Sequence, residues 1–352
     1  MAHSIAHLGR HRSINLLIVL LVAHLTTAIC ACAAPALDPT DRVRLAEFYR
    51  MNRALGDSCW PGWTTAPDAV LLVCDSAEFL IHHPEPSPDF KSLGYDSLLA
   101  DDVFWRPRTF PTNLLATFPA VNGIPTIVIG RAEATERKTS TPWVITLGHE
   151  HFHQWQMSQP WYYAAVDSLG LSGGDKTGMW MLNYPFPYDS AKVDSMFSGL
   201  CRQLSNLLQT ENRDSLGTGL RLYLAERKRF QALLKPADYR YFSFQVWQEG
   251  IARYVEWKII DLAARRYKPS DAFIALPDYR SFEAIAQRYR QNYLKELTTQ
   301  TLPESRRIAF YPFGSAEGMI LARLLPDWPN RYGEQRFRVE RLLEMSLDGV
   351  PR

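Results

Sequence analysis

Residues 143–153 read Trp-Val-Ile-Thr-Leu-Gly-His-Glu-His-Phe-His, an apolar run that ends in an HExxH pentapeptide at 149–153. Pro142 stands directly before this run and favours the start of an α-helix there. On such a helix, residues four apart lie about 40° apart around the axis, so His149 and His153 share one face. The middle histidine points to roughly the opposite side. The spacing therefore predicts two imidazoles one helical turn apart.

Two imidazoles in this arrangement can hold one metal ion, and Zn²⁺ is the ion that this spacing favours. Glu150 lies one step around the helix, where it is placed to act on a metal-bound water rather than to bind the metal. The alternative is that the pentapeptide occurs by chance. A second feature, further along the chain, supports the metal site.

Composition is that of an ordinary globular protein. The chain has 352 residues, 46% hydrophobic and 22% charged, with a formal net charge of +2. This length is enough for one large domain or for two lobes around a cleft. The charge is near balance and forms no basic stripe, so nothing indicates a nucleic-acid partner.

Residues 1–34 have the pattern of a secretory signal, with a basic start, an apolar stretch over 14–23 and small residues after it. Residues 29–32 also resemble a bacterial lipobox, in which Cys32 would carry a lipid anchor. Simple cleavage near Ala33 and a retained anchor are the alternatives. Each of these three alternatives predicts that the rest of the chain lies outside the cytoplasm, as a periplasmic or secreted protein.

Three cysteines remain after this segment, at positions 59, 74 and 201. An odd number in an oxidising compartment indicates at most one disulfide and one spare thiol. We expect Cys59 and Cys74 to be the pair.

Strand-like segments come first in the chain and helical periodicity follows, which predicts an α+β fold. We expect a small N-terminal sheet within 35–141, then a mostly helical lobe within 142–352, with the HExxH helix between them and both parts forming one catalytic unit. The expected strands are 70–73, 78–81, 103–105 and 124–129. The expected helices are 41–55, 190–209, 217–234, 244–265, 280–296 and 314–325, and a loop is expected over 172–189.

A catalytic zinc site usually has three protein ligands and one open position. No histidine follows His153, and Gln159 stands where a third histidine would lie six residues further on. A downstream third ligand must then be a carboxylate or Cys201.

Residues 246–256 read Val-Trp-Gln-Glu-Gly-Ile-Ala-Arg-Tyr-Val-Glu. Together with the HExxH pentapeptide, this run resembles the gluzincins, and in particular their aminopeptidase and glycyl-aminopeptidase branches. The resemblance implies a zincin-like fold and a zinc peptidase in which Glu150 is the general base. It also implies three zinc ligands, His149, His153 and Glu249.

The chain departs from that family in two respects. The interval between His153 and Glu249 is much longer than the turn and loop typical of gluzincins, so we expect extra helices near the site. The segment 130–134 keeps only the Gly and Glu of the family's Gly-x-Met-Glu-Asn strand, which binds the substrate N-terminus. Exopeptidase activity of that kind is therefore unsupported.

Spacing gives separate support to Glu249, because Glu256 is seven residues further on and almost in line with it on a helix. Glu249 would bind the metal while Glu256 accepts a hydrogen bond from a ligand histidine. The alternative is that both are surface carboxylates paired with Arg253 or Lys258.

The expected reaction also needs a hydrogen-bond donor for the developing oxyanion. Tyr311 is our candidate, with Tyr184 as a second, and each is alternatively a core or loop tyrosine. The pair His82 and His83 is more simply a loop pair than a source of ligands or donors. Trp180, on the same loop as Tyr184, is a candidate wall of a substrate groove.

The sequence therefore predicts an exported zinc-dependent metallohydrolase that acts on a peptide or protein substrate. Two alternatives remain open at this stage. One is a catalytically inert zincin-like envelope lipoprotein that acts as a binding or assembly factor. The other is a structural lipoprotein in which the pentapeptide is incidental.

Overall fold

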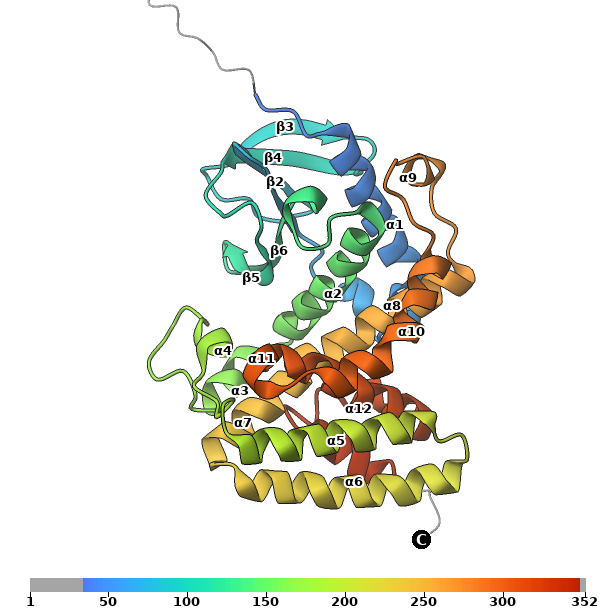
Figure 1. Ribbon diagram of the computed structural model, residues 1–352. Helices are drawn as coiled ribbons and strands as arrows, with labels where there is room; N and C mark the ends of the chain where they lie inside the picture. Colours follow the sequence, from blue (N-terminus) through green and yellow to red (C-terminus); the bar gives the residue numbers. More distant parts are fainter. Residues whose placement is uncertain (1–33, 349–352) are drawn as a thin grey trace, which may run out of the picture. The chain divides into compact units, whose positions relative to one another are not determined.

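The strands of the N-terminal part form one mixed six-stranded sheet with the order β3-β4-β2-β1-β6-β5 (Figure 1). The computed structural model describes residues 34–348, so the predicted signal and the lipid anchor at Cys32 lie outside the described residues. The strand bounds are β1 Val70–Val73, β2 Ala77–Ile81, β3 Lys91–Asp96, β4 Asp101–Pro107, β5 Leu115–Val121 and β6 Ile124–Gly130.

β1 is central because all four of its residues are apolar and buried. It pairs antiparallel with β2 and parallel with β6. The four predicted strands are confirmed, but the sequence analysis missed β3 and β5. Both are edge strands with mostly exposed or half-buried side chains, and β5 contains Pro119 near a break in its register. β3 has no apolar run, and Pro119 argues against a strand in β5 although most of the residues around it are apolar.

Helices make up most of the rest of the described chain, as predicted. The α-helices are α1 Pro39–Cys59, α2 Ser140–Ser158, α3 Tyr162–Ser168, α4 Trp180–Asn183, α5 Ala191–Gln209, α6 Arg213–Leu233, α7 Pro236–Gln245, α8 Ile251–Arg266, α9 Asp271–Ile274, α10 Phe282–Thr299, α11 Leu302–Ser305, α12 Phe310–Leu324 and α13 Val339–Met345. Short 3-10 turns are η1 Trp63–Thr65, η2 Ala132–Ala134, η4 Arg306–Ala309 and η5 Trp328–Arg331. α1 is longer than the predicted 41–55 because Asp38 caps its N-terminus and Pro39 favours its first turn.

α2, which carries the HExxH pentapeptide, lies between the sheet and the helical part (Figure 1). It packs against β5 and β6 on one side and against α8 and α1 on the other. This explains why nearly all of its residues are buried, including polar ones. The helix begins at Ser140, two residues before Pro142, and Asp278 accepts hydrogen bonds from both the backbone nitrogen and the hydroxyl of Ser140.

The predicted helix 244–265 is interrupted by one π-helical turn, η3 Val246–Gly250, which joins α7 to α8. Short π-helical insertions of this kind frequently occur at functional sites. Gly250 lies so close to α12 that a Cβ atom on it would be 2.6 Å from the Cα of Gly314. The turn is therefore held directly against α12.

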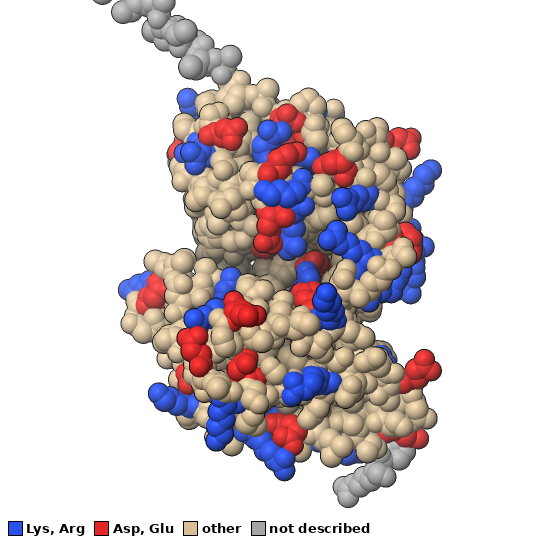
Figure 2. Space-filling view, viewed as in Figure 1, with Lys and Arg blue, Asp and Glu red and all other residues tan. Residues whose placement is uncertain are grey.

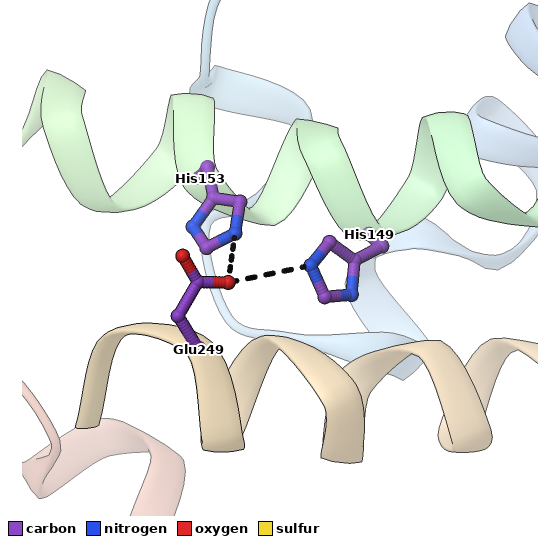
Figure 3. A group of neighbouring side chains, drawn as sticks. All are labelled: His149, His153 and Glu249. Atoms are coloured by element: carbon purple, nitrogen blue, oxygen red, sulfur yellow. Dashed lines mark ion pairs between the residues drawn. The ribbon is translucent and has the colours of Figure 1, made fainter. Parts of the chain in front are cut away.

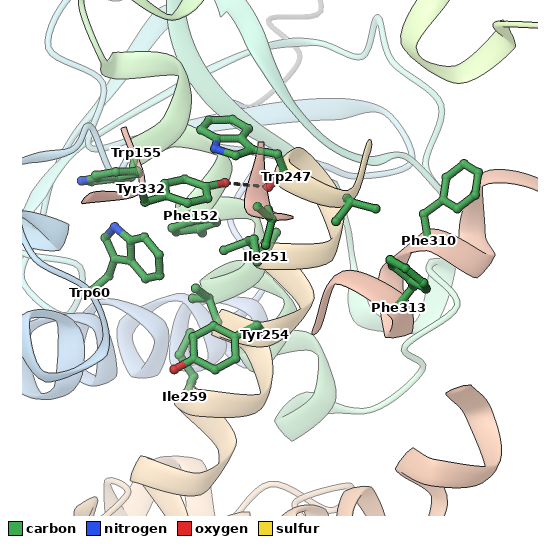
Figure 4. Packing of buried hydrophobic residues seen from close by; sticks show 14 of the residues in the cluster. Trp60, Phe152, Trp155, Trp247, Ile251, Tyr254, Ile259, Phe310, Phe313 and Tyr332 are labelled. Carbon is green, nitrogen blue, oxygen red and sulfur yellow. Dashed lines mark hydrogen bonds between the residues drawn. The ribbon is translucent and has the colours of Figure 1, made fainter. Parts of the chain in front are cut away.

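A cluster of aromatic side chains packs beside α2 and the π-helical turn (Figure 4). The rings of Trp247 and Tyr332 stack with their centroids 4.4 Å apart, and the Tyr332 hydroxyl donates a hydrogen bond to the Trp247 carbonyl at 2.6 Å. Trp60, Phe152 and Trp155 complete the contact between this pair and α2. The core thus fixes the backbone on both sides of the predicted ligands.

Cys59, Cys74 and Cys201 are all free thiols, so the expected disulfide between Cys59 and Cys74 is wrong. Cys59, the last residue of α1, is buried in the main apolar cluster. Within residues 34–348, no helix is long and apolar enough to cross a membrane.

Candidate metal centre

His149, His153 and Glu249 meet between α2 and the π-helical turn (Figure 3). One carboxylate oxygen of Glu249 lies 3.3 Å from Nε2 of His153 and 3.9 Å from Nε2 of His149. One ligand atom from each residue lies within 4.8 Å of the other two. The structure thus brings together the two imidazoles and the carboxylate that the sequence analysis selected.

The donor set fits a zinc ion. Zinc bonds to nitrogen and oxygen are about 2.0–2.2 Å long, so ligand atoms around one tetrahedral ion lie about 3.3–3.5 Å apart. The two distances to Glu249 are close to this spacing, and the histidines are buried. Burial alone would raise the pKa of Glu249, but the adjacent imidazoles of His153 and His149 hold it well below its usual range. Glu249 is therefore an ionised carboxylate, as a metal ligand must be.

His149 is oriented by a second carboxylate. Its Nδ1 lies 3.2 Å from Oε2 of Glu256 on α8, and neither atom has a hydrogen-bond partner elsewhere in the described chain. Arg253 donates to the other oxygen of Glu256 at 2.7 Å and also contacts Glu296. Glu256 therefore occupies the position predicted from its spacing, and it pairs with Arg253 as well.

This contact shifts the pKa values of both partners. Burial would raise the pKa of Glu256, but Arg253 and His149 hold it well below its usual range. Burial would likewise lower the pKa of His149, and its hydrogen bonds to Glu249 and Glu256 instead raise it to about 9. The two carboxylates therefore favour a positive charge at His149, which without a metal ion is a bound proton.

His153 is oriented by amides instead. Its Nδ1 lies 2.7 Å from Oε1 of Gln156 and 3.2 Å from Nε2 of Gln248. The Gln156 amide group also donates to the Gln248 carbonyl at 3.1 Å and to the Tyr332 hydroxyl at 2.8 Å. Sequence reasoning missed both glutamines, although Gln156 lies three residues after His153 and so on the same helix face.

Glu150 is buried, and its side chain accepts a hydrogen bond from Thr117 on the edge strand β5. The Thr117 hydroxyl lies 2.8 Å from Oε2 of Glu150 and 3.0 Å from its carbonyl oxygen. A single hydroxyl thus links the sheet edge to the predicted general base. Thr117 was not found from sequence because β5 itself was missed.

Tyr311 lies beside the same centre. Its ring is parallel to that of His149, with centroids 6.4 Å apart, and its hydroxyl accepts a hydrogen bond from Arg307 at 2.6 Å. Burial and the nearby Glu249 raise the pKa of Tyr311 well above 10, so its hydroxyl keeps its proton and can donate. Arg307, which the sequence analysis did not select, also lies 3.8 Å from the second oxygen of Glu249.

Other candidates from the sequence lie outside this group. Tyr184 donates to Asp238 and stacks on Tyr241, so it is a structural contact. His82 lies between Asp68 and the Leu99 carbonyl.

The other two candidate ligands also have structural surroundings. His83 contacts the Val121 carbonyl, and Cys201 is buried in the apolar core. Glu133, in the segment compared with the aminopeptidase strand, pairs with Arg44.

The long interval between the two ligand segments contains helices α3 to α7, as expected for extra helices near the site. Trp180 is half-buried and contacts Phe244 on α7, which leaves its role as a groove wall a prediction. The resemblance to gluzincins rests on the two short motifs alone. No protein-family model, no curated protein and no solved structure matches the chain.

Proposed function

We propose that the protein is a zinc-dependent peptidase with His149, His153 and Glu249 as metal ligands. The observation that supports this most strongly is the convergence of these three side chains, with Nδ1 of His149 facing the Glu256 carboxylate. A histidine ligand whose second nitrogen contacts a carboxylate is the arrangement that fixes the tautomer required for zinc binding. When bound by three protein ligands, zinc supplies a Lewis acid and lowers the pKa of a bound water to about 7.

The residues of the chain have distinct roles in this proposal. Glu150 takes a proton from the attacking water and passes it to the leaving amine, while the C–N bond breaks and a C–O bond forms. The Thr117 hydroxyl holds the carboxylate of Glu150 in place. Tyr311 donates a hydrogen bond to the developing oxyanion, since its hydroxyl stays protonated.

A peptide substrate is favoured by the position of β5. It is an edge strand of the sheet, and its Thr117 contacts Glu150, so unpaired backbone groups lie next to the proposed general base. An extended peptide can pair with such an edge through main-chain hydrogen bonds. Figure 2 shows a hollow across the middle of this face, between the sheet and the helical part. Export of the enzyme, with or without lipidation at Cys32, is part of the proposal and rests on residues 1–34 of the sequence alone.

Metal content and turnover together test the proposal. The purified protein should bind one equivalent of zinc, and His153→Ala should lose it. Glu150→Gln should keep the zinc but lose hydrolysis of a peptide library. Well-folded protein that takes up no stoichiometric metal would contradict the metal site, and turnover that survives Glu150→Gln would contradict the role of Glu150.

A further inference from the structure

Arg307 lies beside the metal centre and has no hydrogen-bonded carboxylate among residues 34–348. It lies in η4, just before α12, and its side chain is 23% exposed. Its guanidinium donates to the neutral Tyr311 hydroxyl at 2.6 Å, and the Glu249 oxygen is further away at 3.8 Å. Arg253, by contrast, is hydrogen-bonded to two carboxylates, Glu256 and Glu296.

Metal binding would leave this cation less compensated, since Glu249 would then neutralise part of the charge of the ion. A largely desolvated arginine is normally paired with an anion. The guanidinium of Arg307 donates its hydrogen bond to the neutral Tyr311 hydroxyl, so its remaining N–H groups can bind a carboxylate from outside the chain.

We propose that Arg307 binds the C-terminal carboxylate of the substrate, so that the enzyme removes the last residue of a peptide. This inference rests on the proposed function. The carboxylate of a leaving C-terminal residue lies only about 3.5 Å from the scissile carbonyl, one residue along the chain. Arg307 lies 3.8 Å from the second oxygen of the ligand Glu249, so its guanidinium is next to a ligand of the metal centre. The planar guanidinium also suits a carboxylate, which it can bind through two parallel hydrogen bonds.

Two further contacts agree with cleavage at the C-terminal end. Glu133, the residue compared with the anchor for a substrate N-terminus, pairs with Arg44 instead. The edge strand β5 would pair with the part of the substrate that precedes the scissile bond, while Arg307 closes the other end. An acidic side chain in the last residue is a second source of the same carboxylate chemistry, and the test separates the two.

The test measures binding in zinc-loaded Glu150→Gln, which should not turn over substrate. The ligands are acetylated tripeptides of alanine, leucine and phenylalanine, each as the free acid and as the C-terminal amide, with a third set that ends in an amidated aspartate. Calorimetry should show that the free acids bind at least tenfold more tightly than the amides. Adding Arg307→Ala should remove that difference, Arg307→Lys should restore part of it, and zinc content should not change.

Arg306→Ala is the matched control, because Arg306 is the exposed neighbour of Arg307 and pairs with Asp189. It should leave the preference for the free acid intact.

Equal binding of acids and amides, or no binding of either, would overturn the inference. If Arg307→Ala weakened the binding of acids and amides equally, Arg307 would act through Tyr311, and the inference would be wrong. If Arg307→Ala lost zinc, Arg307 would support Glu249 instead, which would also overturn the inference. Preference for the amidated aspartate over the free acids would assign the carboxylate to a side chain and overturn the C-terminal assignment. Arg307-dependent binding of the free acids with no hydrolysis by the unsubstituted protein would overturn the proposed function alone.

Discussion

The two histidines of the metal centre are held in place by different chemistry. Nδ1 of His149 faces the carboxylate of Glu256, which is itself paired with Arg253. Nδ1 of His153 faces the neutral amide of Gln156, which is hydrogen-bonded to the π-helical turn and to Tyr332. A carboxylate increases the basicity of an imidazole ligand, whereas an amide fixes its direction without adding charge. The comparison suggests that Glu256 contributes mainly to metal affinity and that Gln156 contributes mainly to the alignment of α2 with the ligand Glu249.

Glu256→Gln tests the charged side of this comparison and should have the largest effect. The substitution keeps an oxygen that can accept a hydrogen bond from His149, but it removes the negative charge. We expect zinc affinity to fall about 100-fold, at the upper end of the range for residues that support metal ligands. Competition with a chromophoric chelator measures this change.

Glu296→Gln is the control for Glu256→Gln, because Glu296 contacts the same arginine through its other terminal nitrogen, Nη2 rather than Nη1. It should alter zinc affinity by no more than a few-fold. Equal losses in the two variants would show that the charge of the whole network matters, rather than the contact between Glu256 and His149.

Gln156→Ala tests the neutral side and should weaken zinc binding about tenfold. It also removes the hydrogen bonds that join α2 to the π-helical turn, so the metal-free protein should lose about 1–3 kcal/mol in its free energy of unfolding. Urea unfolding of the metal-free protein measures the second effect. If Gln156→Ala reduced zinc affinity more than Glu256→Gln, Glu256 would not be the residue that contributes mainly to metal affinity.

The same contrast explains what could be predicted from sequence. Glu249 was identified through the resemblance of 246–256 to the gluzincins. The two histidine ligands were found because HExxH has a fixed helical spacing, and Glu256 was found because it lies seven residues after Glu249, in line with it on the expected helix. Both inferences depend on periodicity within one element. The π-helical turn at Glu249 was not predicted, since a single inserted residue leaves little trace in a periodic pattern.

The missed residues reach the site from distant parts of the chain. Thr117 does so through a sheet edge that ends in an irregular register, and Arg307 does so through a short turn between two helices. Neither position has a spacing that relates it to the HExxH pentapeptide, so only the tertiary structure brings them to it. The central strands of the sheet were predicted because buried strands are continuous apolar runs. The edge strands were missed because they are not.

His82 provides an imidazole–carboxylate contact outside the metal centre, with which the contact between His149 and Glu256 can be compared. Nδ1 of His82 lies 3.2 Å from Asp68, but the Asp68 side chain is 35% exposed. Burial would lower the pKa of His82, yet Asp68 and the Leu99 carbonyl raise it above 6.5. Because the folded state binds the proton more tightly than the unfolded state, this stabilisation is complete below about pH 6.5 and is lost as the pH rises through the pKa of the folded protein. Solvent screening limits this stabilisation to about 1 kcal/mol or less.

Asp68→Asn should therefore lower the free energy of unfolding more at pH 5.5 than at pH 9, as measured by urea titration at each pH. An equal loss of unfolding free energy at both pH values would show that the contact is an ordinary hydrogen bond.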